Sequence, residues 1–333
     1  MERLLVHTRT VDYDASPAEG DATRVEAKLC DIRRLLFRSL VRDGAIKPGL
    51  VHDVELDMDV GPDLVIRSSR FKMYTVPFGD PAENAGMSCS DIVPRFDGLA
   101  GIKVDDRYVR SIVSKVGGVL GCFHGQTLAV GAGPVISQAC VVDPGRSRRE
   151  TGFGRHLLID AFNYGDTGVT LTGRMVDSRL VLGRNGSCAV EPLLEAELSV
   201  SLEVPDFEYH SATAVIRSPG DGLDGASDIA SALNGIRMGR GVFSEVRQRM
   251  GSSREGAIIS QLLSMMIPVT TQGAMTQLVK LNRPLPGIGG SIAQVGSCHM
   301  WTSGGPLEAR LKKAVSDRFG KDAGDAKRTV EQN

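Results

Sequence analysis

The stretch Val25-Glu-Ala-Lys-Leu-Cys-Asp31-Ile-Arg33 decides the predicted fold, because it recurs later in the chain as Leu171-Thr-Gly-Arg-Met-Val-Asp177-Ser-Arg179. The two stretches lie 146 residues apart, from Asp31 to Asp177. Apolar and polar residues alternate in both, which is typical of a strand with one buried face. The recurrence indicates an internal repeat.

Two further blocks recur in the same order. Residues 52–60 match residues 196–204 at an offset of 144, again with strict alternation. Residues 99–138 align without a gap to residues 134 positions further on. This block contains an apolar spacing typical of an amphipathic helix, at Tyr108, Val109, Ile112 and Val116. Three blocks in one order indicate a tandem duplication.

Each copy contains strands followed by helices, so we predict an α+β fold in which an antiparallel sheet is covered by helices on one face. The predicted units are a first copy at residues 1–150, a second copy at residues 151–284 and a C-terminal extension at residues 285–333. A polar linker is expected at 143–150 and a frayed end at 320–333. The extension contains the Gly-rich stretch 287–291 and a predicted helix after Pro306, with one apolar side formed by Leu307, Leu311, Val315 and Phe319.

The composition excludes several classes of function. The net charge is −1 and only 5% of the 333 residues are aromatic, which argues against nucleic-acid binding. Charged residues follow the initiator Met too soon for a signal peptide, and the longest apolar run, Ala257 to Val269, is too short for a bilayer. We therefore expect a cytoplasmic protein whose six cysteines are thiols or metal ligands, and whose partners are a small-molecule substrate and possible homo-oligomer contacts. The P-loop, Rossmann, nucleophile-elbow and His-Glu-x-x-His motifs do not occur.

Reactive side chains are distributed unequally between the copies. Four of them occur in the first copy and have no reactive counterpart in the second: His52, Cys89, Cys122 and His124. The sequence alignment puts Ala196 at the position of His52, Gly256 at that of Cys122 and Ile258 at that of His124. Because packing residues recur in both copies, residues restricted to one copy require a reason other than packing.

Thiolates and imidazoles are ligands that suit zinc or iron, and the four side chains would form a tetrahedral set. A site with three protein ligands would leave one position for water or substrate. Without a metal, Cys122 would be a thiolate nucleophile paired with His124 or His52, at a helix N-terminus that lowers its pKa. The plain alternative is that these are buried thiols and hydrogen-bonded histidines, as we expect for Cys30, Cys140 and Cys188.

Asp53 and the Cys298-His299 pair are weaker candidates for the site. Asp53 lies on the opposite face of its strand from His52. The second copy has Glu197 at the position of Asp53, which favours a solvated acidic face. Cys298 and His299 lie in the extension, and nothing in the sequence places them near either copy.

The first copy resembles a bacterial domain family of unknown function. The family pattern is Leu-x-Asp, Val-His-Asp, a lone Cys, Leu-x-Gly and Gly-Cys-Thr-His-Leu. The corresponding residues are Leu29-Cys30-Asp31, Val51-His52-Asp53, Cys89, Leu99-Ala100-Gly101 and Gly121-Cys122-Phe123-His124-Gly125. Phe123 and Gly125 depart from the pattern. The resemblance covers about residues 1–140, and because family members are often encoded near genes for aromatic or acyl-CoA degradation, it implies small-molecule metabolism.

The order of elements is also similar to that of U-type iron–sulfur cluster scaffolds. On that resemblance Cys89 and Cys122 match two ligand cysteines, and the third would lie near Val51 or His52. A scaffold of this kind binds metal and acts with partner proteins.

From these observations we predict a metal-dependent enzyme that uses zinc or iron. It would act on a small organic substrate as a lyase, isomerase or hydrolase. The expected metal ligands are His52, Cys89, Cys122 and His124, and the expected catalytic residues are His52, Cys122 and His124. The alternatives are a metal-free Cys/His enzyme, an iron–sulfur or sulfur-carrier scaffold, and a non-catalytic structural module.

Overall fold

The computed structural model of the protein describes residues 2–38, 45–140, 151–182, 188–204, 206–219, 230–237, 242–251, 253–280 and 298–319. The linker expected at 143–150, the Gly-rich stretch 287–291 and the frayed end at 320–333 lie outside these residues.

The main element is one antiparallel sheet of eight strands in the order β10-β9-β8-β7-β1-β2-β5-β6. The strands are β1 (Arg3–Pro17), β2 (Thr23–Arg33), β5 (Gly49–Val60), β6 (Ile66–Thr75), β7 (Thr151–Tyr164), β8 (Gly168–Leu182), β9 (Cys188–Glu203) and β10 (Glu208–Arg217). A small separate pair consists of β3 (Phe37–Arg38) and β4 (Ala45–Ile46). The mixed α+β class is therefore confirmed.

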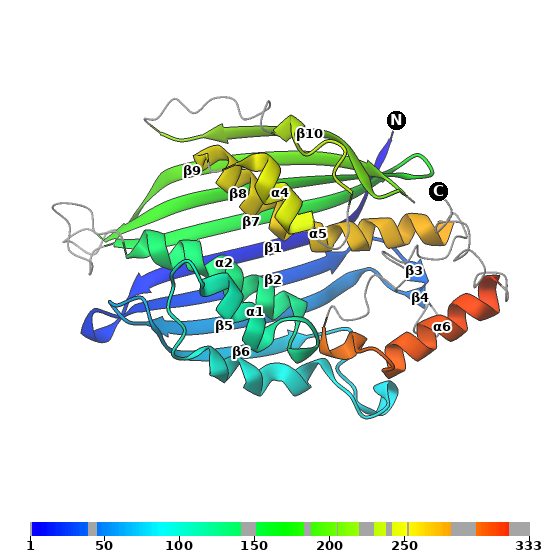
Figure 1. Ribbon diagram of the computed structural model, residues 1–333, viewed down its shortest axis with the longest axis horizontal. Coiled ribbons are helices and arrows are strands. Elements are labelled where there is room, and N and C mark those ends of the chain that lie inside the picture. Colours follow the sequence, from blue (N-terminus) through cyan, green and yellow to red (C-terminus); the bar gives the residue numbers. More distant parts are fainter. Residues whose placement is uncertain are drawn as a thin grey trace.

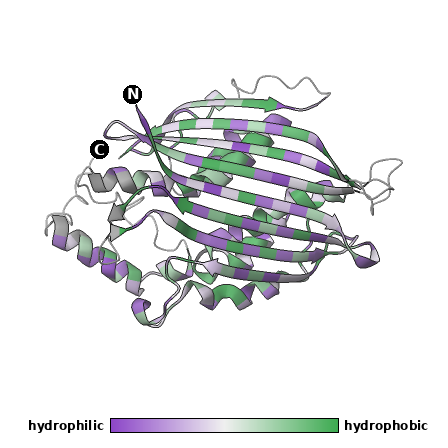
Figure 2. Ribbon diagram, turned by 180° about the vertical axis from the view of Figure 1, so that it is seen from behind, coloured by the Kyte–Doolittle hydropathy of each residue, from purple (hydrophilic) through white to green (hydrophobic). Residues whose placement is uncertain are grey.

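Helices cover one face of the sheet. The α-helices are α1 (Tyr108–Val116), α2 (Phe123–Ala139), α4 (Val242–Met250), α5 (Arg254–Lys280) and α6 (Pro306–Phe319). The 3-10 helices are η1 (Glu19–Asp21), η2 (Ala82–Asn84), η3 (Cys89–Leu99), η4 (Gly118–Leu120) and η6 (His299–Trp301). Figure 1 shows α1, α2, α4 and α5 lying across the strands, and Figure 2 shows the strands from the opposite side, in front of the helices.

The strand order is symmetric about the seam between β1 and β7. The first half of the molecule, β1 to α2, contributes β1-β2-β5-β6, and the second half, β7 to α5, contributes β7-β8-β9-β10. Val11 pairs with Leu157, the residue 146 positions later, so the seam joins equivalent points of the two halves. One buried apolar cluster extends through both halves. The two predicted sheets are therefore parts of one continuous sheet.

The register of the sheet corrects one sequence correspondence. Asp31 lies opposite His52, whereas Asp177 lies opposite Leu194. The counterpart of His52 is thus Leu194, and the assignment to Ala196 is wrong by two residues. A shift of two residues leaves every side chain on the same face, so the alternation cannot detect it and only the backbone pairing does.

The helix predicted after Pro306 is present as α6. Its Leu307 and Leu311 are buried against Met300 and Trp301. Among the described helices, none combines the length and the apolar character that crossing a membrane requires.

Close packing of α2 on the sheet gives a testable consequence. A Cβ at Gly131 would overlap the hydroxyl of the fully buried Tyr13 and would lie 2.6 Å from Met265 Cε. We expect Gly131→Ala to lower the free energy of unfolding by about 1–3 kcal/mol, because a rigid ring must move. Urea denaturation measures the change. The control is Gly98→Ala, whose Cβ would meet no atom within 4 Å; equal destabilisation of both variants would contradict this packing.

Candidate active site

Three side chains of the first half form a row across the sheet. Arg9 on β1 lies opposite Asp31 on β2, and Asp31 lies opposite His52 on β5. Directly opposite residues share a face of the sheet, with Cβ atoms about 4.5–5.5 Å apart. All three side chains are buried beneath the helices, so the strand register alone brings them into contact.

Asp31 is the centre of this site. Arg9 binds it in bidentate fashion, with Nε 2.7 Å from Oδ1 and Nη2 2.8 Å from Oδ2. His7 Nε2 lies 3.1 Å from Oδ1, and His52 Nδ1 lies 3.0 Å from Oδ2. His124 Nε2 lies 3.2 Å from the same Oδ2. The carboxylate therefore fixes the orientation of three imidazole rings (His7, His52 and His124).

The start of α2 supplies the remaining groups. Cys122 is the N-cap residue and His124 lies in the first turn. Cys122 Sγ is 3.6 Å from His124 Nδ1, so the His124 ring joins the thiol to the Asp31 carboxylate through its two nitrogens. The ring of His124 also packs on that of His52, with centroids 3.7 Å apart. Gly125 allows the first turn of α2 to lie directly against Phe96 and Phe71, because a Cβ there would overlap Phe96.

Burial and Arg9 set the protonation of the site. Burial opposes charge on Asp31, but the Arg9 guanidinium and the hydrogen bonds from Arg9, His124 and His52 outweigh it and hold the pKa of Asp31 well below its usual value. Burial, together with the neighbouring His52, lowers the pKa of His124 to about 3. Burial raises the pKa of Cys122 to about 12, against the opposing effect of the Gly125 and His124 backbone N–H groups. At neutral pH the site therefore contains a carboxylate, a neutral His124 imidazole and a neutral thiol.

The second half contains the same ion pair in different surroundings. Arg155 binds Asp177 with Nε 2.6 Å from Oδ1 and Nη2 2.7 Å from Oδ2. Both residues follow Arg9 and Asp31 by 146 positions. The counterparts of His7, His52 and His124 are Phe153, Leu194 and Ile258. The Arg–Asp pair is thus common to both halves, whereas the histidines are specific to the first.

Two polar atoms of the site have no partner among the described residues. These are His7 Nδ1 and Arg9 Nη1, both buried. His7 Nδ1 is an acceptor, since the Nε2–H of the neutral ring donates to Asp31, and Arg9 Nη1 is a donor. Buried polar atoms without a partner are uncommon in folded proteins and often mark a place where a water, ion or ligand binds. Within the described part of the chain, the only group of three or more His, Cys, Asp or Glu residues close enough to hold a metal is Asp31, His52 and His124, whose ligand atoms lie within 4.8 Å of one another.

The structure brings together three of the four residues singled out in the sequence. His52 and His124 share the Asp31 carboxylate, and Cys122 contacts His124. Cys89 is not part of this group, because it lies at the start of η3 and packs against the Met300 and Trp301 cluster. As expected, Asp53 is on the other face of the sheet, where Cys30 Sγ lies 3.5 Å from its Oδ1.

His7, Arg9 and Asp31 were not among the site residues expected from the sequence. A signal for two of them exists, because Arg9 and Asp31 both recur at the same offset, as Arg155 and Asp177. Charged residues kept at buried strand positions in both halves indicate a buried ion pair.

Residues 7–138 match the family model described as protein of unknown function (DUF2889). The matched segment contains every member of the site, from His7 to His124, and ends before β7. No curated protein matches the chain, and no solved structure does.

The neutral histidines predict sensitivity to acid. Burial lowers the pKa of His7 and of His124, so the unfolded chain binds more protons than the folded one below pH about 6.5. Stability therefore falls as the pH drops below about 6.5, by up to about 1.4 kcal/mol per pH unit for each histidine until the pH reaches its lowered pKa, which is about 3 for His124. Urea denaturation at pH 7.5 and 4.5 measures this loss. We expect His124→Gln to reduce it and the exposed-site control His210→Gln to retain it; an unchanged loss in His124→Gln would exclude a buried neutral His124.

Proposed function

We propose that the first half is a Cys/His-dependent enzyme that hydrolyses a small ester or thioester. The observation that carries this proposal is the position of the His124 ring, with Nδ1 3.6 Å from Cys122 Sγ and Nε2 3.2 Å from Asp31 Oδ2. A nucleophile, a base and a group that orients the base form the arrangement used in nucleophilic catalysis on several unrelated folds.

The tautomer of His124 suits this role. Because Asp31 is a carboxylate, it accepts the proton of His124 Nε2–H, which leaves the Nδ1 lone pair towards the thiol of Cys122. As Sγ attacks the substrate carbonyl carbon, the thiol proton passes to Nδ1, and His124 then gives it to the leaving alcohol or thiol. Water hydrolyses the acyl-thiol with His124 as base, and the proton returns to Sγ when the acid departs.

The neutral resting state determines how the thiol is activated. A thiol whose pKa is about 12 is not an exposed thiolate at neutral pH. His124 therefore acts as a general base during attack, and the imidazolium that forms is stabilised by Asp31. The second ring nitrogen of His52, directed away from the Asp31 contact, provides a further acid–base group beside the His124 ring.

We also propose that the chain arose by tandem duplication and that the second half is the degenerate copy. Three features support this origin: the symmetric strand order, the Val11–Leu157 pair at the seam, and the two Arg–Asp pairs at one offset. The second half would then complete the sheet and the core of the first.

The thiol mechanism predicts covalent acylation of one cysteine. With p-nitrophenyl acetate and S-phenyl thioacetate as probes, we expect hydrolysis and an acetyl adduct on Cys122 detected by mass spectrometry of the quenched protein. Cys122→Ser and His124→Gln should each lower the rate by about 100-fold or more.

The matched control is Cys30→Ser, which changes a β2 cysteine on the opposite face of the sheet and should retain the activity. Hydrolysis that persists in Cys122→Ser, or an adduct confined to other cysteines, would exclude Cys122 as the nucleophile. Absence of turnover with both probes would argue against acyl hydrolysis.

A metal-dependent enzyme, with zinc or iron, is the second candidate. Two imidazole nitrogens and a carboxylate oxygen are a donor set that suits either metal, and the separations of 3.0 and 3.2 Å from Asp31 Oδ2 agree with ligands about 2.1 Å from one ion. The unpartnered buried atoms His7 Nδ1 and Arg9 Nη1 are compatible with a further bound group. The bidentate contact of Arg9 weighs against this candidate, because it occupies both carboxylate oxygens with a cation.

Elemental analysis of anaerobically purified protein separates these candidates. A metal site predicts near-stoichiometric zinc or iron that is lost in His52→Ala and His124→Gln and kept in Cys89→Ser, since Cys89 lies outside the cluster. Well-folded protein without metal would exclude this candidate. The iron–sulfur scaffold predicts a different result: iron with labile sulfide that is lost in Cys89→Ser and Cys122→Ser. The structural module predicts that Cys122→Ser and His52→Ala keep full cellular function.

A further inference from the structure

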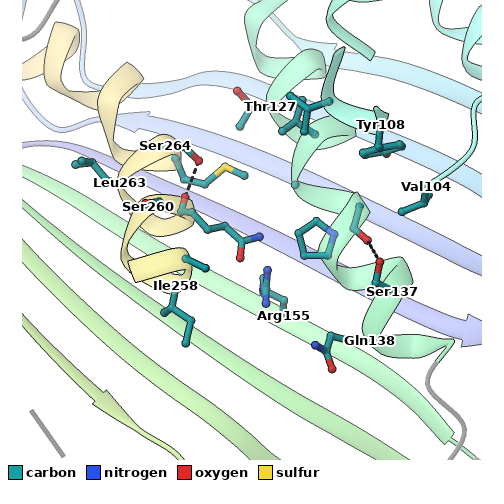
Figure 3. Close-up of a pocket in the computed structure, with 18 of the residues that line it drawn as sticks. Val104, Tyr108, Thr127, Ser137, Gln138, Arg155, Ile258, Ser260, Leu263 and Ser264 are labelled. Atoms are coloured by element: carbon teal, nitrogen blue, oxygen red, sulfur yellow. Dashed lines mark hydrogen bonds between the residues drawn. The ribbon is translucent and has the colours of Figure 1, made fainter. Parts of the chain in front are cut away.

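A cavity of about 790 Å³ lies between α2 and α5, above strands β7 and β8. Its residues come from both halves of the molecule, with Tyr108, Thr127 and Ser137 on one side and Ile258, Ser260 and Leu263 on the other (Figure 3). A volume of this size accommodates a small organic molecule.

The floor of the cavity is the second-half counterpart of the His/Asp site. Arg155 and Asp177 correspond to Arg9 and Asp31, and both line the cavity. The three residues that replace the histidines, Phe153, Leu194 and Ile258, line it as well. Where the first half fills this position with imidazoles, the second half has apolar side chains and open space.

Arg155 provides the polar feature of the floor. Its Nε and Nη2 bind Asp177, and its Nη1 is buried without a partner among the described residues. Figure 3 shows Arg155 between α2 and α5, in the midst of the other lining side chains. A buried N–H donor of this kind is costly to leave unbonded, and the acceptor atom of a ligand in the cavity would satisfy it.

The rest of the lining is mostly apolar with a few neutral polar groups. The side-chain amides are those of Gln126, Gln138 and Gln261. Besides the Arg155–Asp177 pair, the charged lining residues are Asp105, Arg247 and Arg254, and all three are exposed to solvent. The interior therefore contains one ion pair without net charge, and a buried ligand charge would lack a counter-ion there.

We propose that this cavity is a second binding site, separate from the Cys/His site, for an uncharged and largely apolar molecule with one carbonyl oxygen. The carbonyl accepts a hydrogen bond from Arg155 Nη1, and the apolar part lies along the Phe153, Leu194 and Ile258 surface. The proposal is independent of the reaction assigned to the first half, because it uses the counterpart residues of the second.

Three probes of equal chain length and different head group test this assignment: octanamide, octanoate and octylammonium. We expect isothermal titration calorimetry of the full chain to show saturable binding of octanamide, at least about 10-fold tighter than of either charged probe. Arg155→Lys keeps the positive charge opposite Asp177 but replaces the guanidinium, with its separate N–H groups, by a single ammonium group. It should weaken octanamide binding about 10-fold or more.

Cavity-filling variants locate the site. Val130→Trp on α2 and Ser260→Phe on α5 should each abolish octanamide binding, because both positions line the cavity. Two helices are used so that a folding defect in one variant leaves the other informative. Val119→Trp is the control, since Val119 is exposed on η4 and does not line the cavity. No saturable octanamide binding, tighter binding of octanoate, or retained binding in folded Val130→Trp and Ser260→Phe would overturn the proposal.

Discussion

The bidentate contact between Arg9 and Asp31 is the interaction on which the candidate site depends. A carboxylate with 1% exposure cannot remain ionised without a counter-charge, and Arg9 supplies it from the neighbouring strand. Once ionised, Asp31 accepts hydrogen bonds from imidazoles on β1, β5 and α2. One ionised carboxylate therefore links the first turn of α2 to two strands and orients each of the three rings.

The same ion pair in the second half shows which features belong to the fold and which to the chemistry. Arg155 and Asp177 keep the geometry of the pair although no histidine surrounds them. Removing one partner of a buried ion pair leaves an uncompensated charge, which is costly, so the pair stabilises the fold in either surroundings. The surroundings of the pair differ between the halves: a polar site with a thiol in the first and a mostly apolar cavity in the second.

The low polarity of the interior shapes the chemistry available to the first half. Burial keeps His124 neutral and Cys122 protonated, so neither partner of the proposed proton transfer is charged in the resting site. In the proposed reaction the thiol proton of Cys122 therefore moves to His124 while Sγ attacks the substrate, and not before. A neutral imidazole is also the form that binds a metal ion. For this reason the metal content and the acylation of the thiol are the measurements that separate the two candidate functions.

The sequence by itself determined the alternating strands at 25–33, 52–60, 171–179 and 196–204, the helix that begins at Tyr108, and the concentration of reactive residues in the first half, because each of these depends on local periodicity or on residue identity. It also indicated an internal repeat, which stays a prediction. It correctly placed Cys122 just before a helix, and His52 and Asp53 on opposite faces of one strand. Tertiary structure alone joined the two sheets across β1 and β7, matched His52 to Leu194, and separated Cys89 from the histidines. Alternation fixes the face on which a side chain lies but not its neighbour on the next strand, and that neighbour depends on the hydrogen-bond register and its bulges. For this reason Asp31, an ordinary strand residue in the sequence, became the centre of the site only when the strands were paired.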